Sequence, residues 1–182
     1  VVLPDAPKEQ TLNALVGAGF GAAGQRCMAS SVVVLVGEAR EWIDEMAQRA
    51  TTLTVGAGHN KGVEIGPVIS CAALSRIEAL IATGVEDGAR LVLDGRKPAV
   101  PGYENGNFVG PTLFAGVKPG MRIYDQEIFG PVLCVVEVDT LDDAIALINA
   151  NPNGNGTGLF TRSGGAARHF QEEIDVGQVG IN

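Results

Sequence analysis

A cysteine stands at the end of a stretch of very small residues, Gly21-Ala22-Ala23-Gly24-Gln25-Arg26-Cys27. Such a stretch is poor material for a packed core, because glycine and alanine leave little side-chain area to bury. Small residues do allow a backbone to pass close to a ligand. A cation such as Arg26 raises the thiolate fraction of a cysteine where its side chain points at the sulfur. The pattern therefore predicts that Cys27 is a nucleophile rather than a structural cysteine.

A second segment lies 100 residues further on and reads Gln126-Glu127-Ile128-Phe129-Gly130-Pro131. Together the two segments resemble the nucleophile motif and the nicotinamide-contacting motif of the aldehyde dehydrogenase superfamily. The resemblance extends over essentially all 182 residues. Further matching segments are Gly66-Pro67, Gly110-Pro111-Thr112 and Asn155-Gly156-Thr157-Gly158-Leu159.

The resemblance implies a role for each of these side chains. The Cys27 thiolate adds to an aldehyde, hydride passes to NAD, and an acyl thioester is left on Cys27. The backbone N–H of Cys27 is a natural donor to the developing oxyanion. Glu127 is expected to accept hydrogen bonds from the hydroxyls of the nicotinamide ribose, because a carboxylate is an acceptor suited to a diol. Phe129 is expected to pack beside the nicotinamide ring.

Three segments resemble a narrower branch of the superfamily, the CoA-acylating methylmalonate-semialdehyde dehydrogenases: 19–29, 102–112 and 175–182. That resemblance implies that coenzyme A, as co-substrate, takes the acyl group from Cys27. It also implies that Arg26 binds the carboxylate of a methylmalonate or malonate semialdehyde, since a guanidinium holds a carboxylate through two parallel hydrogen bonds. The products would be propionyl-CoA or acetyl-CoA and CO2.

Other interpretations stay open. A hydrolytic relative would release a carboxylic acid, and a non-catalytic structural module would keep the fold without the chemistry. Arg26 would serve equally well as a surface residue or an ion-pair partner. We expect residues 1–182 to be the cysteine-bearing catalytic domain of a longer enzyme, with the NAD-binding domain and the oligomerisation segment outside this chain. On that view the isolated chain is inactive and binds NAD weakly, because the pyrophosphate and adenosine sites lie elsewhere.

Composition excludes several other classes of function. The net charge of −8 argues against nucleic acid and anionic membranes as partners, since both need clustered Lys and Arg. The longest apolar run, Val32–Val36, is far shorter than the roughly 18 residues that span a bilayer. The partners that remain are a small-molecule semialdehyde and, in the full-length enzyme, further copies of the same chain as a dimer or tetramer.

The three cysteines include no CxxC pair, which is typical of free thiols in a reducing compartment. We therefore expect a cytoplasmic protein, or one of the mitochondrial matrix in a eukaryote. Cys134 lies in an apolar run and is expected to pack in the core, and Cys71 is expected to be inert. His59 and His169 have no cysteine at ligand spacing, so no metal site is expected.

The elements that must position these residues alternate between helix and strand. This alternation predicts an α/β fold with an open, mostly parallel sheet covered by helices. A long loop over 56–69 is rich in glycine, and loops of that length often carry function. Residues 108–114 are expected to form an edge segment broken by Pro111. Helices are expected over 8–20, 38–50, 70–87, 140–150 and 166–174, and strands over 31–36, 91–93, 131–138, 158–160 and 178–181.

Overall fold

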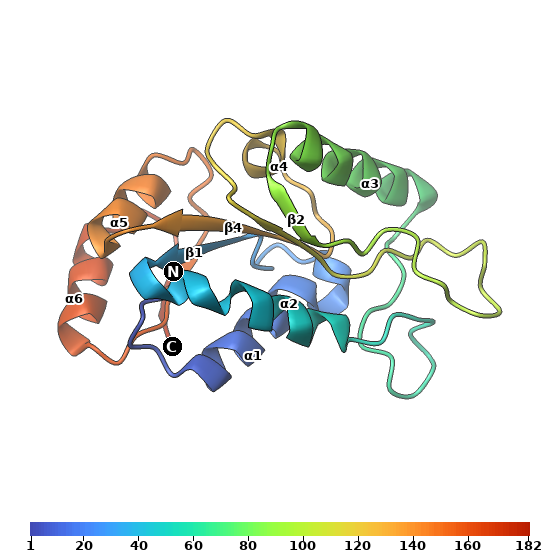
Figure 1. Ribbon diagram of the computed structural model, residues 1–182, viewed down its shortest axis with the longest axis horizontal. Coiled ribbons are helices and arrows are strands. Elements are labelled where there is room, and N and C mark those ends of the chain that lie inside the picture. Colours follow the sequence, from blue (N-terminus) through green and yellow to red (C-terminus); the bar gives the residue numbers. More distant parts are fainter.

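The strand elements build one sheet that runs through the middle of the molecule (Figure 1). A computed structural model describes residues 1–182. Four strands build the sheet: β1 (Val32–Val36), β2 (Arg90–Leu93), β3 (Thr112–Ala115) and β4 (Val132–Val138). They lie in the order β1-β4-β3-β2. Neighbouring strands are parallel except at the β2 edge, where β2 runs antiparallel to β3.

The first residues of the chain join this sheet to a second pair of strands. The pair consists of β5 (Thr157–Leu159) and β6 (Val179–Ile181), which are parallel. Val2 bridges Leu35 of β1 on one side and Phe160 on the other. Its N–H donates to Val34 O at 2.9 Å, and the Leu3 N–H donates to Phe160 O at 3.1 Å. The sheet is therefore continuous and mostly parallel, which confirms the predicted fold class.

Helices cover both faces of the sheet (Figure 1). One face carries the pair α1 and α2. On the other face α3 and α4 lie over the half that contains β2 and β3, and α5 and α6 lie over the half that contains β1. Short 3₁₀ turns, η1 (Gly21–Gly24) and η2 (Gly37–Trp42), follow α1 and precede α2. The helices are α1 (Lys8–Phe20), α2 (Ile43–Thr51), α3 (Cys71–Glu86), α4 (Arg122–Asp125), α5 (Leu141–Asn149) and α6 (Gly164–Glu173).

Strand β1 is buried on both faces, as its run of valines predicts. Val33 and Leu35 belong to the larger apolar cluster, which includes α1 and α2. Val34 and Val36 point the other way and join a smaller cluster with Ile145 of α5 and Phe170 of α6. The period-2 alternation of a strand thus places one central element in two cores.

Side-chain caps begin α3 and α5, at the first residues of the helices expected over 70–87 and 140–150. Ser70 Oγ accepts a hydrogen bond from the Ala73 N–H at 3.1 Å at the start of α3. Thr140 and Asp143 form a reciprocal capping box at the start of α5. Each cap satisfies backbone N–H groups that have no partner within the helix.

The predicted edge segment over 108–114 is wrong. Strand β3 pairs with β4 on one side and with β2 on the other, and all four of its residues are buried. Pro111 does not interrupt the ladder because it stands just before the strand, and the ladder begins with the Thr112 N–H donating to Pro131 O at 2.9 Å. A proline at this position costs no strand hydrogen bond.

The short helix α4 was not predicted from the sequence, and the carboxylate of the residue that follows α3 holds it in place. Asp87 accepts hydrogen bonds from the backbone N–H of Arg122 at 2.8 Å and from its Nη2 at 2.6 Å. The adjacent Arg122 guanidinium lowers the pKa of Asp87 below its ordinary value. This ion pair fixes the start of the segment that runs through α4 to Glu127.

The pair predicts a pH-dependent contribution to stability. A carboxyl group whose pKa is lowered by folding stabilises the folded state above its ordinary pKa, and loses that effect as the pH falls through the lowered value. We expect Asp87→Asn to lower the urea unfolding midpoint of the full-length protein at neutral pH, and the difference to disappear in strong acid. Asp139→Asn is the control, since Asp139 pairs with Arg40 but its side chain is 85% exposed. Equal shifts from the two variants at neutral pH would contradict the expectation.

Candidate active site

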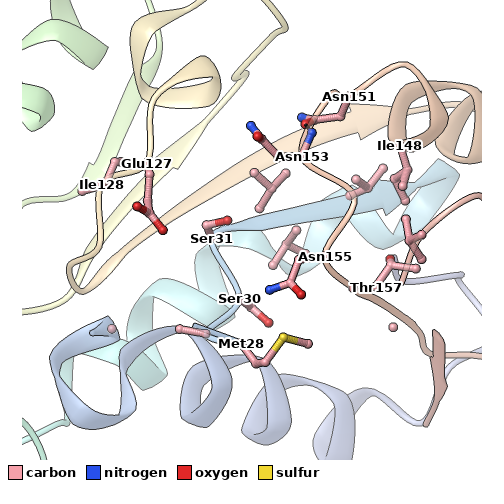
Figure 2. A pocket seen from close by; sticks show the side chains of 18 of the residues that line it. Met28, Ser30, Ser31, Glu127, Ile128, Ile148, Asn151, Asn153, Asn155 and Thr157 are labelled. Atoms are coloured by element: carbon pink, nitrogen blue, oxygen red, sulfur yellow. Dashed lines mark hydrogen bonds between the residues drawn. The ribbon is translucent and has the colours of Figure 1, made fainter. Parts of the chain in front are cut away.

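A cavity of about 790 Å³ lies at the amino ends of the parallel strands. Because neighbouring strands are parallel, the segments that enter them meet at one edge of the sheet. Figure 2 shows this cavity, with Met28 and Ser30 on one side, Glu127 on another and the asparagines of the β5 loop on a third. The cavity is lined mainly by residues of the segments 26–34, 123–130, 151–158 and 178–180.

Cys27 lines this cavity and is exposed. The other two cysteines lie outside the lining. Cys134 is buried in β4, and burial raises the pKa of its thiol to about 12. That confirms its predicted place in the core, where it stays protonated and inert. Cys71 is exposed at the first position of α3. Cys27 is thus the cysteine that can contact a molecule bound in the cavity.

Both peptide planes beside Cys27 are held by hydrogen bonds. The Ala29 N–H donates to Arg26 O at 3.1 Å, and Asn155 Nδ2 donates to Cys27 O at 3.1 Å. The N–H of Cys27 itself donates no hydrogen bond within the chain. That N–H is therefore free to donate to a negative charge that develops next to the sulfur.

The approach to Cys27 has an unusual backbone. Ala22, Ala23 and Gly24 have successive φ angles of 51°, 54° and 66°. Left-handed conformations cost L-residues roughly 1–2 kcal/mol each, and runs of them are rare. Strain of this kind persists only where the surrounding structure enforces it, and it clusters at functional sites.

A direct backbone contact joins the cysteine segment to the Glu127 segment. A Cβ atom on Gly24 would lie 2.1 Å from Gly130 O, so only glycine fits. Next to it, Gln25 Nε2 donates to Phe129 O at 3.2 Å, and Gln25 Oε1 accepts from the Ile69 N–H at 2.9 Å. The two motifs that lie 100 residues apart in the sequence are therefore one structural unit.

The Glu127 segment is held at two of its carbonyl groups. Arg76 Nη1 of α3 donates to Glu127 O at 3.0 Å, and Gln25 holds Phe129 O. Phe129 has a φ of 48°, which is strained for a bulky residue. Both residues line the cavity, and Figure 2 shows the Glu127 carboxylate directed into it, on the side of Ser31. An exposed carboxylate and an aromatic ring here suit a sugar diol and a flat ring.

Arg26 also lines the cavity, but one nitrogen of its guanidinium binds the end of α1. Its Nη2 donates to Ala18 O at 2.7 Å and to Gly17 O at 3.2 Å. These carbonyls belong to the last turn of α1, where Gly17 O also accepts from the Gly21 N–H and Ala18 O from the Ser30 N–H at 3.0 Å. Its Nε and Nη1 donate no hydrogen bond within the chain. The helix contact was not predicted from the sequence, and the predicted carboxylate contact stays a prediction.

The structure thus brings together all four residues predicted to form the site: Arg26, Cys27, Glu127 and Phe129 line one cavity. It adds Asn155, which the sequence placed in a family motif without a role. No group of three or more His, Cys, Asp or Glu side chains is arranged to hold a metal ion. No helix is both long and apolar enough to cross a bilayer.

The family model described as the aldehyde dehydrogenase family matches residues 1–182. The chain belongs to the aldehyde dehydrogenase family. It is 59% identical over its full length to a Drosophila melanogaster protein named probable methylmalonate-semialdehyde/malonate-semialdehyde dehydrogenase [acylating], mitochondrial, and covers 35% of that protein. The human protein named methylmalonate-semialdehyde/malonate-semialdehyde dehydrogenase [acylating], mitochondrial, is 57% identical, with 34% covered. The chain spans about a third of the length of these curated relatives.

Solved aldehyde dehydrogenase structures have the same fold. Methylmalonate-semialdehyde dehydrogenase from Oceanimonas doudoroffii superposes with a TM-score of 0.96 at 48% identity, over 99% of this chain and 37% of that one. Betaine aldehyde dehydrogenase from Staphylococcus aureus in complex with NAD+ gives a TM-score of 0.95 at 28% identity, over 99% of this chain and 36% of that one. The predicted family membership is confirmed.

The contact between Gly24 and Gly130 yields a stability prediction. We expect Gly24→Ala to lower the free energy of unfolding of the full-length protein by about 2 kcal/mol or more, from left-handed strain and the clash together. Gly17→Ala is the control, because it lies on α1 with nothing within 4 Å of its added Cβ. It should gain up to about 1 kcal/mol in helix propensity. Urea unfolding measures both, and a Gly24 variant as stable as wild type would argue against the contact.

Proposed function

We propose that residues 1–182 are the catalytic domain of an NAD-dependent enzyme that oxidises methylmalonate or malonate semialdehyde and passes the acyl group to coenzyme A. The observation that carries this proposal is the exposed Cys27, which shares one cavity with Glu127 and Phe129. The identity of 57% to 59% with relatives named as acylating dehydrogenases supports the substrate and the acyl acceptor. We place the whole protein in the cytoplasm, or in the matrix of a mitochondrion, as a homo-oligomer.

The chemistry begins at the sulfur. The Cys27 thiolate attacks the aldehyde carbon and the carbonyl electron pair moves onto oxygen, giving a thiohemiacetal oxyanion. The Cys27 N–H, free of partners within the chain, donates to that oxygen. When the oxygen re-forms its carbonyl, the carbon loses hydride and an acyl thioester remains on Cys27. Attack by the thiolate of coenzyme A on this thioester transfers the acyl group and restores the Cys27 thiolate.

NAD supplies the hydride acceptor when it is bound. Glu127 accepts hydrogen bonds from the ribose hydroxyls, and Phe129 packs beside the nicotinamide ring. Both side chains fit this task, since the carboxylate is exposed in the cavity and the ring belongs to the same short segment. Arg76 and Gln25 fix the backbone of that segment, which keeps the nicotinamide side of the cavity at a set distance from Cys27.

Arg26 binds the carboxylate end of the semialdehyde. Its Nη2 stays on the carbonyls of α1, which anchors the guanidinium beside Cys27. Its Nε and Nη1 keep free N–H groups for a substrate carboxylate. They lie on different edges of the guanidinium, so each offers a single charge-assisted hydrogen bond. An anchored guanidinium loses little freedom on binding and so orients the aldehyde end toward the sulfur. After oxidation, cleavage of the bond to that carboxylate releases CO2 and leaves the electron pair on the α-carbon as a thioester enolate. Protonation of this carbon from solvent and transfer to coenzyme A give propionyl-CoA or acetyl-CoA.

Two alternatives remain to be separated from this proposal. The runner-up is a hydrolytic reaction that releases a carboxylic acid. The fold does not choose between the two acyl acceptors, since a dehydrogenase of another aldehyde shares it at 28% identity. A module that has kept the fold without catalysis is the third possibility. The acyl acceptor separates the first two, and the presence of any turnover separates both from the third.

The first activity prediction concerns the acyl acceptor. We expect the full-length protein to form NADH from methylmalonate or malonate semialdehyde with sustained turnover only when coenzyme A is present. Cys27→Ala should abolish NADH formation because no thioester can form, whereas Cys71→Ala should keep it, since Cys71 lies outside the cavity. Sustained turnover to a free acid without coenzyme A would favour the hydrolytic enzyme, and no turnover would favour the module.

The second activity prediction concerns substrate charge. We expect Arg26→Leu to lower kcat/KM for the semialdehyde acids by about a hundredfold, the loss of a charge-assisted contact of roughly 3 kcal/mol. Propanal, which has no carboxylate, should lose far less, and that loss reports the contact between Arg26 and α1. Steady-state rates with both substrates measure the difference. Equal losses of kcat/KM for both substrates would show that Arg26 does not bind the carboxylate.

A further inference from the structure

The side chain of Asn155 binds the main chain of Cys27 from a distant part of the sequence. Its Nδ2 donates to Cys27 O at 3.1 Å across a separation of 128 residues. On the other side of the Cys27 Cα, the Ala29 N–H donates to Arg26 O. The peptide between residues 26 and 27 carries the free N–H, and the peptide between residues 27 and 28 carries the carbonyl that Asn155 holds. The two bonds together fix φ and ψ of Cys27, and hence the direction of its Cα–Cβ bond.

We infer that Asn155 is a positioning residue that sets the orientation of the Cys27 thiol and of its free N–H. The inference rests on the proposed function of Cys27 and adds to it a residue from the β5 loop. Asn155 does not touch the reacting atoms through this bond. It acts through the main chain of Cys27, and a misplacement of about 1 Å in a reacting group can cost about a hundredfold in rate.

The loop that carries Asn155 is itself held in place. The Gly177 N–H donates to Gly154 O at 2.9 Å, and the Thr157 N–H donates to Gln178 O at 2.9 Å. A Cβ atom on Gly177 would lie 2.8 Å from Asn155 O, so the loop lies directly against the segment that enters β6. The contacts with the segment that enters β6 therefore hold Asn155 in place, and its side-chain amide reaches Cys27 from this loop.

A second contact joins the same two segments. A Cβ atom on Gly156 would lie 2.8 Å from Met28 Cε, so the methionine side chain packs directly against the glycine. Asn155 and Gly156 thus dock on Cys27 and Met28 as neighbouring pairs, one through a hydrogen bond and one through van der Waals contact. Figure 2 shows Asn155 beside Ser30 and Met28, facing the cysteine segment from the β5 loop.

The nicotinamide side of the cavity does not depend on this contact. Glu127 is held through Arg76, and Phe129 is held through Gln25. Loss of the Asn155 amide should therefore disturb the sulfur and leave the binding of NAD intact. This separation gives the inference a kinetic signature that a general loss of stability would not produce.

The experiment uses the full-length protein with two matched variants. Asn155→Ala removes the donor to Cys27 O without adding charge. Asn149→Ala removes another amide that holds a main-chain carbonyl, Glu173 O at 2.8 Å, but Asn149 lies outside the cavity lining. The pre-steady-state burst of NADH is measured with semialdehyde and NAD and is normalised to protein concentration, because thiol alkylation would also count the exposed Cys71.

We expect Asn155→Ala to lower the burst rate constant at least about tenfold with an unchanged KM for NAD, and Asn149→Ala to keep the wild-type value. Backbone hydrogen exchange adds a readout that needs no turnover: exchange at the Ala29 amide should accelerate in Asn155→Ala and stay unchanged in Asn149→Ala.

Equal burst rates in wild type and Asn155→Ala, or equal losses in both variants, would overturn the positioning role and leave the Cys27 chemistry standing. If the wild-type protein forms no NADH, the proposed function fails, and hydrogen exchange alone decides on the positioning role. Unchanged exchange at Ala29 in Asn155→Ala would overturn it.

Discussion

The close approach of Gly24 to Gly130 is the constraint on which the site depends. It allows no side chain at Gly24, and it accompanies a left-handed backbone from Ala22 to Gly24. Helix α1 and strand β4 would each form without this contact, because their own apolar patterns bury them. The strained approach to Cys27 has no such local support, so its conformational cost must be met by the packing around it.

The position of the cavity follows from the parallel sheet. Ligands in open α/β sheets usually bind at the carboxyl ends of the strands, whereas here the cavity lies at the amino ends of β1, β4, β5 and β6. The loops that enter parallel strands all reach the same edge, so the Cys27 thiol, the Glu127 carboxylate and the Asn155 amide converge there from distant parts of the sequence. The candidate site therefore lies at the edge of the sheet opposite to the usual one.

Several side chains of the site act on the main chain. Gln25, Arg76 and Asn155 each hold a carbonyl of the segment that carries Cys27 or Glu127, and Arg26 holds two carbonyls of α1. Carbonyls in irregular segments lack a ladder partner, and each one left unpaired away from water would cost free energy. The hydrogen bonds that satisfy these groups also fix the angles at which functional side chains leave the backbone.

The sequence alone determined most of the elements and the chemical candidates. Caps at Ser70 and Thr140, the period of apolar residues and the small residues before Cys27 are local signals, readable within a few positions. Only the tertiary structure decided that β3 lies inside the sheet, that Arg26 binds the end of α1, and that Asn155 holds Cys27. The place of β3 depends on which strands become neighbours, and no local pattern encodes the register of such a pairing. The bond from Asn155 to Cys27 spans 128 residues. The bonds from Arg26 span only 8 and 9 residues, but they need the left-handed turn over residues 22–24, which the surrounding packing enforces.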